Sequence, residues 1–110
     1  MNIDFIKWMV GYADEYEINE DRVLYRGSWD WIGNINVSPL YPLLLQRAIE
    51  GVNHSFSLDT SNYEIKTRCY GQYEVHNDYN IPQKEWTSEN IDQSKEQALK
   101  YIYEKENNNA

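Results

Sequence analysis

The longest run of alternating apolar and polar residues in this sequence exceeds what one strand of a small domain can occupy. Its apolar phase consists of Tyr63, Ile65, Thr67, Cys69, Gly71, Tyr73 and Val75. A period of two predicts β-structure with one buried face, yet a single strand of this length would extend about 45 Å at ~3.4 Å per residue. We therefore predict a hairpin whose loop is residues 70–72. The paired positions in that hairpin are Cys69 with Tyr73, Thr67 with Val75, and Ile65 with Asn77.

A second hairpin is predicted nearer the N-terminus, where short apolar runs alternate with turn-forming residues. Residues 19–21 separate the runs 16–18 and 22–25, and residues 26–28 form the hairpin loop. A three-residue loop places the large apolar groups on one face, so both tryptophans that follow are expected in the core. The pairs in this register are Tyr25 with Trp29 and Val23 with Trp31. A two-residue loop would instead pair Leu24 with Trp29 and Val23 with Asp30.

Two helices are predicted in the N-terminal half from capping residues and from apolar positions three or four residues apart. The first covers residues 4–14, with Asp4 as its cap. The second begins at Ser38-Pro39, because the serine hydroxyl can bind a free amide and proline has no amide to satisfy. It ends at Gly51.

The C-terminal half contains a loop, a short strand and a closing helix besides the predicted hairpin. Residues 54–62 are polar and irregular, which favours a loop, and residues 84–87 predict an edge strand. The closing helix has Ser88 or Asp92 as its cap. Its apolar face consists of Ile91, Ala98, Leu99 and Ile102.

These elements together predict an α+β fold in the order α-β-β-α-β-β-α, with three helices packed with an antiparallel sheet built from the two hairpins. A single domain is expected over residues 1–104, and residues 105–110 are expected to form a disordered polar tail. The residues expected to be buried on the sheet are Trp29, Trp31, Ile65, Tyr73 and Val75, beneath helices containing Leu44, Ala48, Ile49, Leu99 and Ile102.

Acidic residues concentrate at the two ends of the chain, whose net charge is −8. Residues 1–21 contain six acidic residues against Lys7, residues 22–84 are balanced, and residues 85–110 contain six acidic residues against three lysines. This negative potential repels phosphate backbones and anionic membranes and attracts basic protein surfaces. A protein partner with a basic surface is therefore favoured over direct binding of nucleic acid or membrane. With no apolar run of the ~20 residues that span a bilayer and no signal-peptide pattern, a cytoplasmic protein is expected.

The sequence contains no common motif for a cofactor, a metal or a hydrolase, so neither an enzyme nor a cofactor or metal site is expected. Cys69 lies on the apolar phase of its strand, which favours a core position. As an alternative, Cys69 is a nucleophile with His54 or His76 as its base. A second enzymatic alternative is acid and base catalysis by a carboxylate pair drawn from Asp14, Glu15 and Asp30.

Two predicted helical segments carry a family resemblance: SPLYPLLLQRAIEGVN at residues 38–53 and IDQSKEQALKYI at residues 91–102. They resemble segments of short, acidic, aromatic-rich proteins encoded by bacteriophages and related mobile elements, some of which are described as phage α/β/α sandwich domains. Neither segment contains a catalytic residue. The resemblance implies a phage accessory protein that binds a host protein in the host cytoplasm, as several small acidic anti-CRISPR and other anti-defence proteins do without enzymatic activity.

The leading hypothesis is stoichiometric binding to a basic surface of a host protein. In its sharper form the protein is a nucleic-acid mimic whose carboxylates take the place of phosphates, and exposed tyrosines anchor the contact. The candidate partner-binding residues are Asp14, Glu15, Tyr16, Glu17, Glu20 and Asp21. The alternative is a protein that binds or sequesters a nucleotide signal in an aromatic pocket. The cations of that pocket would come from Arg22, Arg26, Arg47, Lys66 and Arg68.

Overall fold

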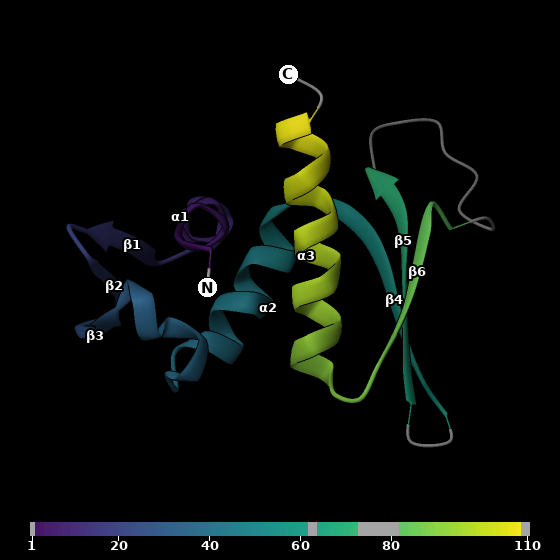
Figure 1. Ribbon diagram of the computed structural model, residues 1–110, viewed down its shortest axis with the longest axis horizontal. Helices are drawn as coiled ribbons and strands as arrows, with labels where there is room; N and C mark the ends of the chain where they lie inside the picture. Colours follow the sequence, from purple (N-terminus) through teal and green to yellow (C-terminus); the bar gives the residue numbers. More distant parts are fainter. Residues whose placement is uncertain (1, 62–63, 73–81, 109–110) are drawn as a thin grey trace. The chain divides into compact units, whose positions relative to one another are not determined.

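Two three-stranded antiparallel sheets and the helices packed with them form the part of the chain described by the computed structural model, residues 2–61, 64–72 and 82–108 (Figure 1). The α+β class is therefore confirmed. The predicted order around one sheet is wrong, because each sheet has three strands and a 3-10 helix precedes the central α-helix. The chain divides into two compact units, Met1–Val52 and Asn53–Ala110, and each is described by itself. The single domain expected over residues 1–104 stays a prediction.

The N-terminal unit combines two α-helices, a 3-10 helix and a sheet in the order β1-β2-β3. Its elements are α1 (Ile3–Tyr12), β1 (Tyr16–Asn19), β2 (Arg22–Tyr25), β3 (Ser28–Trp31), the 3-10 helix η1 (Ile32–Val37) and α2 (Tyr41–Gly51). α1 contacts β1, η1 and α2. The unit's most deeply buried side chains are Phe5, Ile6, Met9, Val23, Ile35, Leu44, Leu45 and Ala48.

Both α-helices of this unit begin at a different residue from the one predicted. The Asn2 side chain accepts a hydrogen bond from a first-turn amide of α1 at 3.2 Å, so Asn2 is the cap. Asp4 lies in the first turn, where its charge suits the helix dipole. α2 begins only at Tyr41, because Ser38 closes a turn before the helix and its hydroxyl accepts a hydrogen bond from the Leu40 amide at 3.1 Å.

α1 and α2 approach each other closely where Gly51 meets the main chain of Tyr12. A Cβ atom at Gly51 would overlap the Tyr12 carbonyl group. Glycine is required at this position because no side chain fits between the two backbones. By contrast, the position of a Cβ atom at Gly11 in α1 is surrounded by open space.

β2 and β3 are joined by a two-residue turn, so the predicted three-residue loop is wrong. Arg26 and Gly27 have φ angles of 47° and 85°. Such left-handed turns match the natural twist of the strands that they join. The resulting pairs are Arg22 with Trp31, Val23 with Asp30, Leu24 with Trp29, and Tyr25 with Ser28. In this register Val23 is buried in the core, whereas Trp29 and Trp31 are exposed. The predicted burial of the two tryptophans is therefore wrong.

The C-terminal unit is a sheet in the order β4-β5-β6 with α3 packed on it (Figure 1). Its elements are β4 (His54–Ser61), β5 (Glu64–Gln72), β6 (Lys84–Ser88) and α3 (Ile91–Asn108). The short strand expected at residues 84–87 is confirmed. The loop expected at residues 54–62 is wrong, because residues 54–61 form β4.

The hairpin predicted around residues 70–72 is also wrong, because β5 continues through this segment. Cys69 pairs with Phe56 of β4 on one side and with Lys84 of β6 on the other. Both edges of β5 are therefore occupied at this point, which leaves no edge for the predicted partner strand. The predicted partners that lie outside the described residues are Tyr73, Val75 and Asn77.

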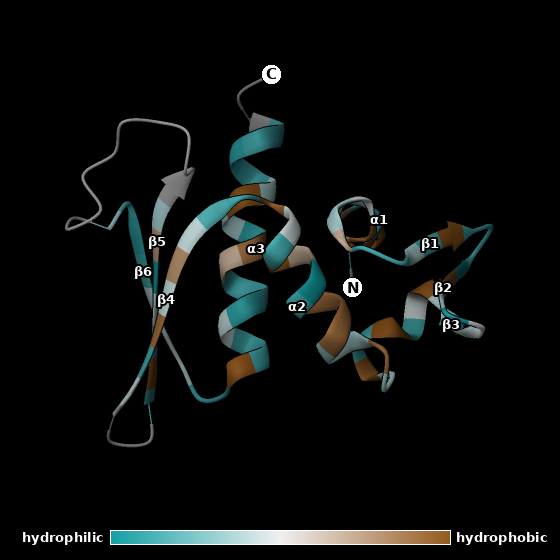
Figure 2. Ribbon diagram, turned by 180° about the vertical axis from the view of Figure 1, so that it is seen from behind, coloured by the Kyte–Doolittle hydropathy of each residue, from teal (hydrophilic) through white to brown (hydrophobic). Residues whose placement is uncertain are grey.

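α3 covers the apolar face of this sheet. β5 places Ile65, Thr67 and Cys69 on that face, where all three are buried. The Trp86 ring of β6 packs edge-on against Tyr101 of α3, with 5.4 Å between ring centroids. Figure 2 colours α3 mainly hydrophilic, with separate hydrophobic bands. Its buried side chains are Ser94, Ala98, Leu99 and Ile102.

α3 begins and ends differently from the predicted closing helix. Its cap is Asn90 and not Ser88 or Asp92, because the Asn90 side chain accepts a hydrogen bond from a first-turn amide at 2.8 Å. Ile91, expected on the apolar face, is 52% exposed. The helix continues through residues 105–108, which belong to the expected polar tail.

Candidate functional site

The predicted partner-binding carboxylates lie together in the N-terminal unit, in β1 and in the turns on either side of it. They are Asp14, Glu15, Glu17, Glu20 and Asp21, all exposed, and we call residues 14–21 the acidic segment. Glu15 and Glu20 have positive φ angles of 69° and 56°, so a tight turn precedes and follows the strand. The acidic segment thus presents five carboxylates from a short stretch of ordered backbone.

Part of the acidic segment lines an open groove of about 600 Å³ beside the C-terminal half of α1. The residues lining it are Lys7, Val10, Gly11, Tyr12, Ala13, Asp14, Glu15, Tyr16, Glu17 and Ile18. The lining combines apolar side chains with three carboxylates. A groove of this composition can accept a side chain that has an apolar stem and a cationic end.

Glu15 of the acidic segment is paired with a cation of the same unit. Its side chain forms an ion pair with Arg26 of the β2–β3 turn. The hydrogen bond from the Arg26 guanidinium lowers the pKa of Glu15 below its ordinary value. The same guanidinium lies 5.3 Å from the centroid of the Tyr25 ring. Glu15 therefore ties the start of β1 to the hairpin turn, and its lowered pKa does not suit a general acid.

Tyr16, expected to be exposed within the acidic segment, is only 7% exposed, so the predicted exposure is wrong. Its ring stacks on Tyr25, with 4.5 Å between centroids, and its hydroxyl donates a hydrogen bond to the Leu40 carbonyl oxygen at 2.8 Å. Burial raises the pKa of Tyr16 to about 12. Tyr16 thus fixes β1 to the segment before α2 and positions the neighbouring carboxylates. Its own contact with a partner stays a prediction.

An aromatic surface on the other side of the same sheet was not predicted from the sequence. Alternation along β1–β3 places six side chains on the outer face. We call this surface the tryptophan face: Glu17, Asn19, Arg22, Leu24, Trp29 and Trp31. Trp29 is 49% exposed and Trp31 is 51% exposed. Their rings meet edge to face, with 5.0 Å between centroids and an interplanar angle of 85°.

The opposite face of the sheet carries Tyr16, Val23 and Tyr25, which are buried or half-buried. The signal for this division was the pair Arg26-Gly27, since a glycine at the second turn position favours a two-residue turn. With that turn, the alternation along β3 places the side chains of Trp29 and Trp31 on the outer face of the sheet. The predicted three-residue loop instead placed the large apolar residues on one face.

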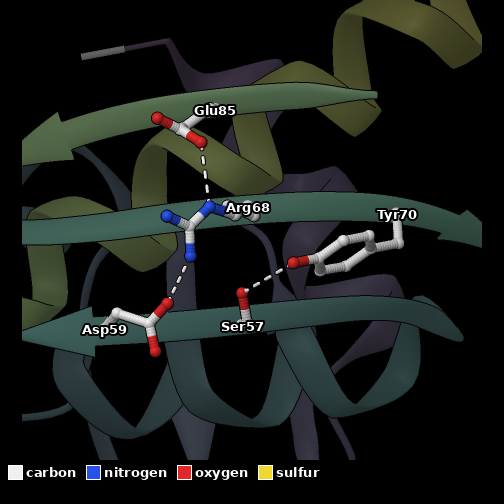
Figure 3. Close-up of polar contacts among 5 residues, drawn as sticks. All are labelled: Ser57, Asp59, Arg68, Tyr70 and Glu85. Carbon is white, nitrogen blue, oxygen red and sulfur yellow. Dashed lines mark hydrogen bonds and ion pairs between the residues drawn. The ribbon is translucent and has the colours of Figure 1, made fainter. Parts of the chain in front are cut away.

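The outer face of the second sheet is polar and internally paired (Figure 3). Arg68 of β5 donates a hydrogen bond to Glu85 of β6 at 2.8 Å and forms an ion pair with Asp59 of β4. The Ser57 and Tyr70 hydroxyls lie 3.3 Å apart. The two carboxylates raise the pKa of Arg68. Arg68 therefore links all three strands.

The five cations proposed for a nucleotide pocket are divided between the two units. Arg22, Arg26 and Arg47 belong to the N-terminal unit, and Lys66 and Arg68 to the C-terminal unit. Arg26 and Arg68 are each engaged by carboxylates of their own unit. A guanidinium that is already paired is a poorer ligand for phosphate, because binding would first have to break the internal pair.

Cys69 is fully buried on β5, so its predicted core position is confirmed. His54, one proposed base, is the first residue of β4. Its ring stacks near that of Phe56, with 6.2 Å between the ring centroids. His76, the other proposed base, lies outside the described residues. A thiol without exposed surface is not accessible to a substrate from solvent in this conformation.

The remaining chemical candidates concern carboxylates, metals and membranes. Asp30 is half-buried, and its Oδ1 accepts a hydrogen bond from the Trp31 amide at 2.8 Å. Over residues 2–61, 64–72 and 82–108, no three His, Cys, Asp or Glu side chains lie close enough together to hold a metal ion. Among the described helices, none has the length and apolar character to cross a membrane.

Comparisons of this chain with protein-family models, with curated proteins and with solved structures give no match.

Proposed function

We propose that this protein acts by stoichiometric binding to a basic surface of another protein, through the acidic segment of its N-terminal unit. The observation that carries the proposal is the arrangement of five exposed carboxylates on one ordered segment beside an open groove. The biological setting that we propose is that of a phage accessory or anti-defence protein acting on a host protein, in line with the resemblance of residues 38–53 and 91–102.

The fixed backbone of the acidic segment supports this proposal. Tyr16 and Glu15 tie it to the rest of the unit through the hydrogen bond to Leu40 and the ion pair with Arg26. A segment that is already ordered loses little conformational freedom when a partner binds. Its exposed carboxylates would also attract a basic partner over a distance of about one Debye length, ~8 Å at physiological salt.

In the sharper form of the proposal, the carboxylates occupy a groove that the partner uses for nucleic-acid phosphates. Binding of this protein and binding of nucleic acid would then exclude each other. A small-ligand function is supported less, because two of its five proposed cations are already paired with carboxylates.

The first experiment isolates the contribution of the acidic segment. The test variant combines Asp14→Asn, Glu17→Gln, Glu20→Gln and Asp21→Asn, and leaves Glu15 in its ion pair. The control variant removes the same charge from exposed positions of the other unit, with Glu64→Gln, Glu89→Gln, Asp92→Asn and Glu104→Gln. Circular dichroism checks that both variants fold.

A partner is first captured from bacterial lysate with the unmodified protein, and association and dissociation rates are then measured at several salt concentrations. The test variant should associate at least ten times more slowly and with a shallower salt dependence, whereas the control variant should keep most of the association rate. Equal rates for the two variants would refute the acidic-segment mechanism. Adding nucleic acid to the captured partner tests mimicry, since a mimic must be displaced.

A further inference from the structure

We propose that the tryptophan face is the centre of the partner interface and that it binds an arginine-bearing segment of the basic partner. This inference rests on the proposed function, which supplies the basic partner. It adds a second surface, which shares only Glu17 with the groove lining, and a chemical preference for arginine over lysine. The residues that carry it are Glu17, Arg22, Trp29 and Trp31.

The strand register fixes Trp29 and Trp31 on the solvent side of the sheet. Glu17, Leu24 and Trp29 form one row across β1, β2 and β3, because Glu17 pairs with Leu24 and Leu24 pairs with Trp29. In the neighbouring position, Val23 is fully buried. Turning the tryptophans inward would expose Val23, so the face cannot bury its indoles without losing core packing.

The two indoles form a preorganised contact surface. Each keeps about half of its surface exposed, and their edge-to-face contact restricts the rotation of both rings. Tryptophan is enriched among the residues that contribute most to the free energy of protein association. Because these rings are already held in place, covering them would cost little side-chain entropy.

The chemistry of the face favours a guanidinium group. The Arg22 guanidinium already lies 5.5 Å from the centroid of the Trp29 ring, which shows that this ring accepts a cation on its π surface. Glu17 stands in the same cross-strand row. Asp21 lies at the end of β3, since its carbonyl oxygen accepts a hydrogen bond from the Ile32 amide at 2.8 Å.

A partner arginine could therefore stack on an indole and reach a carboxylate at the same time. Lysine lacks the planar group that stacks on an aromatic ring, so it should bind this face less tightly. Bases of a nucleic acid could also stack on indoles, but their phosphates would be repelled by the carboxylates of Glu17 and the adjacent Asp21. A second copy of this chain would bring two acidic surfaces together.

The experiment uses two synthetic peptides of equal length, one alternating glycine with arginine and the other alternating glycine with lysine. The chain has four tryptophans, whose indole N–H signals can be assigned by single Trp→Phe variants in NMR spectra. The arginine peptide should bind several times more tightly than the lysine peptide. It should shift the signals of Trp29 and Trp31 and leave those of Trp8 and Trp86 in place.

The Trp29→Ala and Trp31→Ala variants should lose the preference for arginine, so that the two peptides bind equally. Trp29→Phe should keep part of the preference, because a phenyl ring still stacks. Val37→Ala is the matched control: Val37 is an 80% exposed apolar residue of the same unit, outside the tryptophan face. The preference should survive in this variant.

Unchanged indole signals, or an arginine preference that survives in both alanine variants, would overturn the inference. So would tighter binding of a single-stranded oligonucleotide than of the arginine peptide, or concentration-dependent dimerisation that shifts the same two signals. If the acidic-segment variant loses both peptides while the tryptophan variants behave like the unmodified protein, the inference alone fails. If the acidic-segment variant binds its captured partner normally, the proposed function fails as well.

Discussion

At the residue scale, two buried hydroxyl groups differ in whether they have a hydrogen-bond partner. The Tyr16 hydroxyl donates to the Leu40 carbonyl oxygen. The Thr67 hydroxyl, on the buried face of β5, has no hydrogen-bond partner among the described residues. A buried polar group that is hydrogen-bonded contributes modestly to stability, whereas an unpaired one destabilises the fold. The two residues therefore give predictions of opposite sign.

Replacing Tyr16 by phenylalanine should lower the free energy of unfolding by about 1 kcal/mol at neutral pH, the net contribution of a typical hydrogen bond. The pKa of Tyr16, about 12 in the folded protein, exceeds its unfolded value of roughly 10. The folded state therefore retains this proton when the unfolded state has lost it, so stability falls as pH rises from about 10 to 12. Urea unfolding at neutral and alkaline pH should detect a smaller alkaline loss in Tyr16→Phe. Equal losses in both proteins would contradict this account.

Replacing Thr67 by valine should raise the free energy of unfolding by about 1 to 2 kcal/mol, because it removes an unpaired hydroxyl from the buried face. Thr87, exposed on the neighbouring strand β6, is the matched control. Thr87→Val changes the intrinsic strand preference in the same way, but it removes no hydroxyl group from the buried face. Chemical denaturation of both variants gives the comparison. Destabilisation by Thr67→Val would mean that the hydroxyl has a partner after all.

At the element scale, the predictions from sequence succeeded where a segment carries its own signal. The helices around Leu44 and Leu99 and the strand at Trp86 follow from local periodicity. The partners of β5 do not, because alternation around Cys69 shows that a strand exists and which of its faces is apolar, but not which segment lies beside it. β4 was not predicted, because its polar residues are typical of a loop. They form an edge strand through their pairing with β5, which the local sequence does not indicate.

The candidate site, too, could be predicted from the sequence only in part. The exposure of the five carboxylates in the acidic segment follows from their chemistry, since carboxylates are seldom buried. Tyr16 could not be placed from composition, because its position depends on the phase of β1 relative to the core. The tryptophan face depended on choosing between two hairpin registers. Burial of Trp29 favours one of them and the Arg26-Gly27 turn favours the other.

The contact between α1 and α2 gives a prediction at this scale. Alanine usually stabilises a helix relative to glycine by about 1 kcal/mol. Gly11→Ala should show this gain, because open space surrounds the new methyl group. Gly51→Ala should instead destabilise the protein by about 2 kcal/mol or more, because the methyl group would overlap the Tyr12 carbonyl and force the helices apart. Thermal unfolding of the two variants tests the difference, and a gain for both would show that the helices can separate without cost.

At the scale of the whole molecule, the net charge of −8 sets up repulsion that a few ion pairs offset only locally. Sodium chloride should therefore raise the melting temperature between about 0.05 and 0.5 M, since screening weakens repulsion across the surface. The variant with four carboxylates of the acidic segment neutralised should show a smaller rise. A melting temperature that falls with salt would mean that the ion pairs of Arg26 and Arg68 contribute more than the repulsion.

The two-residue turn between β2 and β3 has a consequence for how such a protein can evolve. Core and surface positions alternate one by one along these strands, so substitutions at Trp29 or Trp31 leave Val23 and its neighbours untouched. If the tryptophan face binds a partner as we propose, its specificity can then change while the fold stays the same. Gly27 is the exception: its φ of 85° favours glycine at this turn position, so a substitution there would strain the turn that sets the register of both indoles. Variants selected for a new partner should therefore differ at the indoles and retain this glycine.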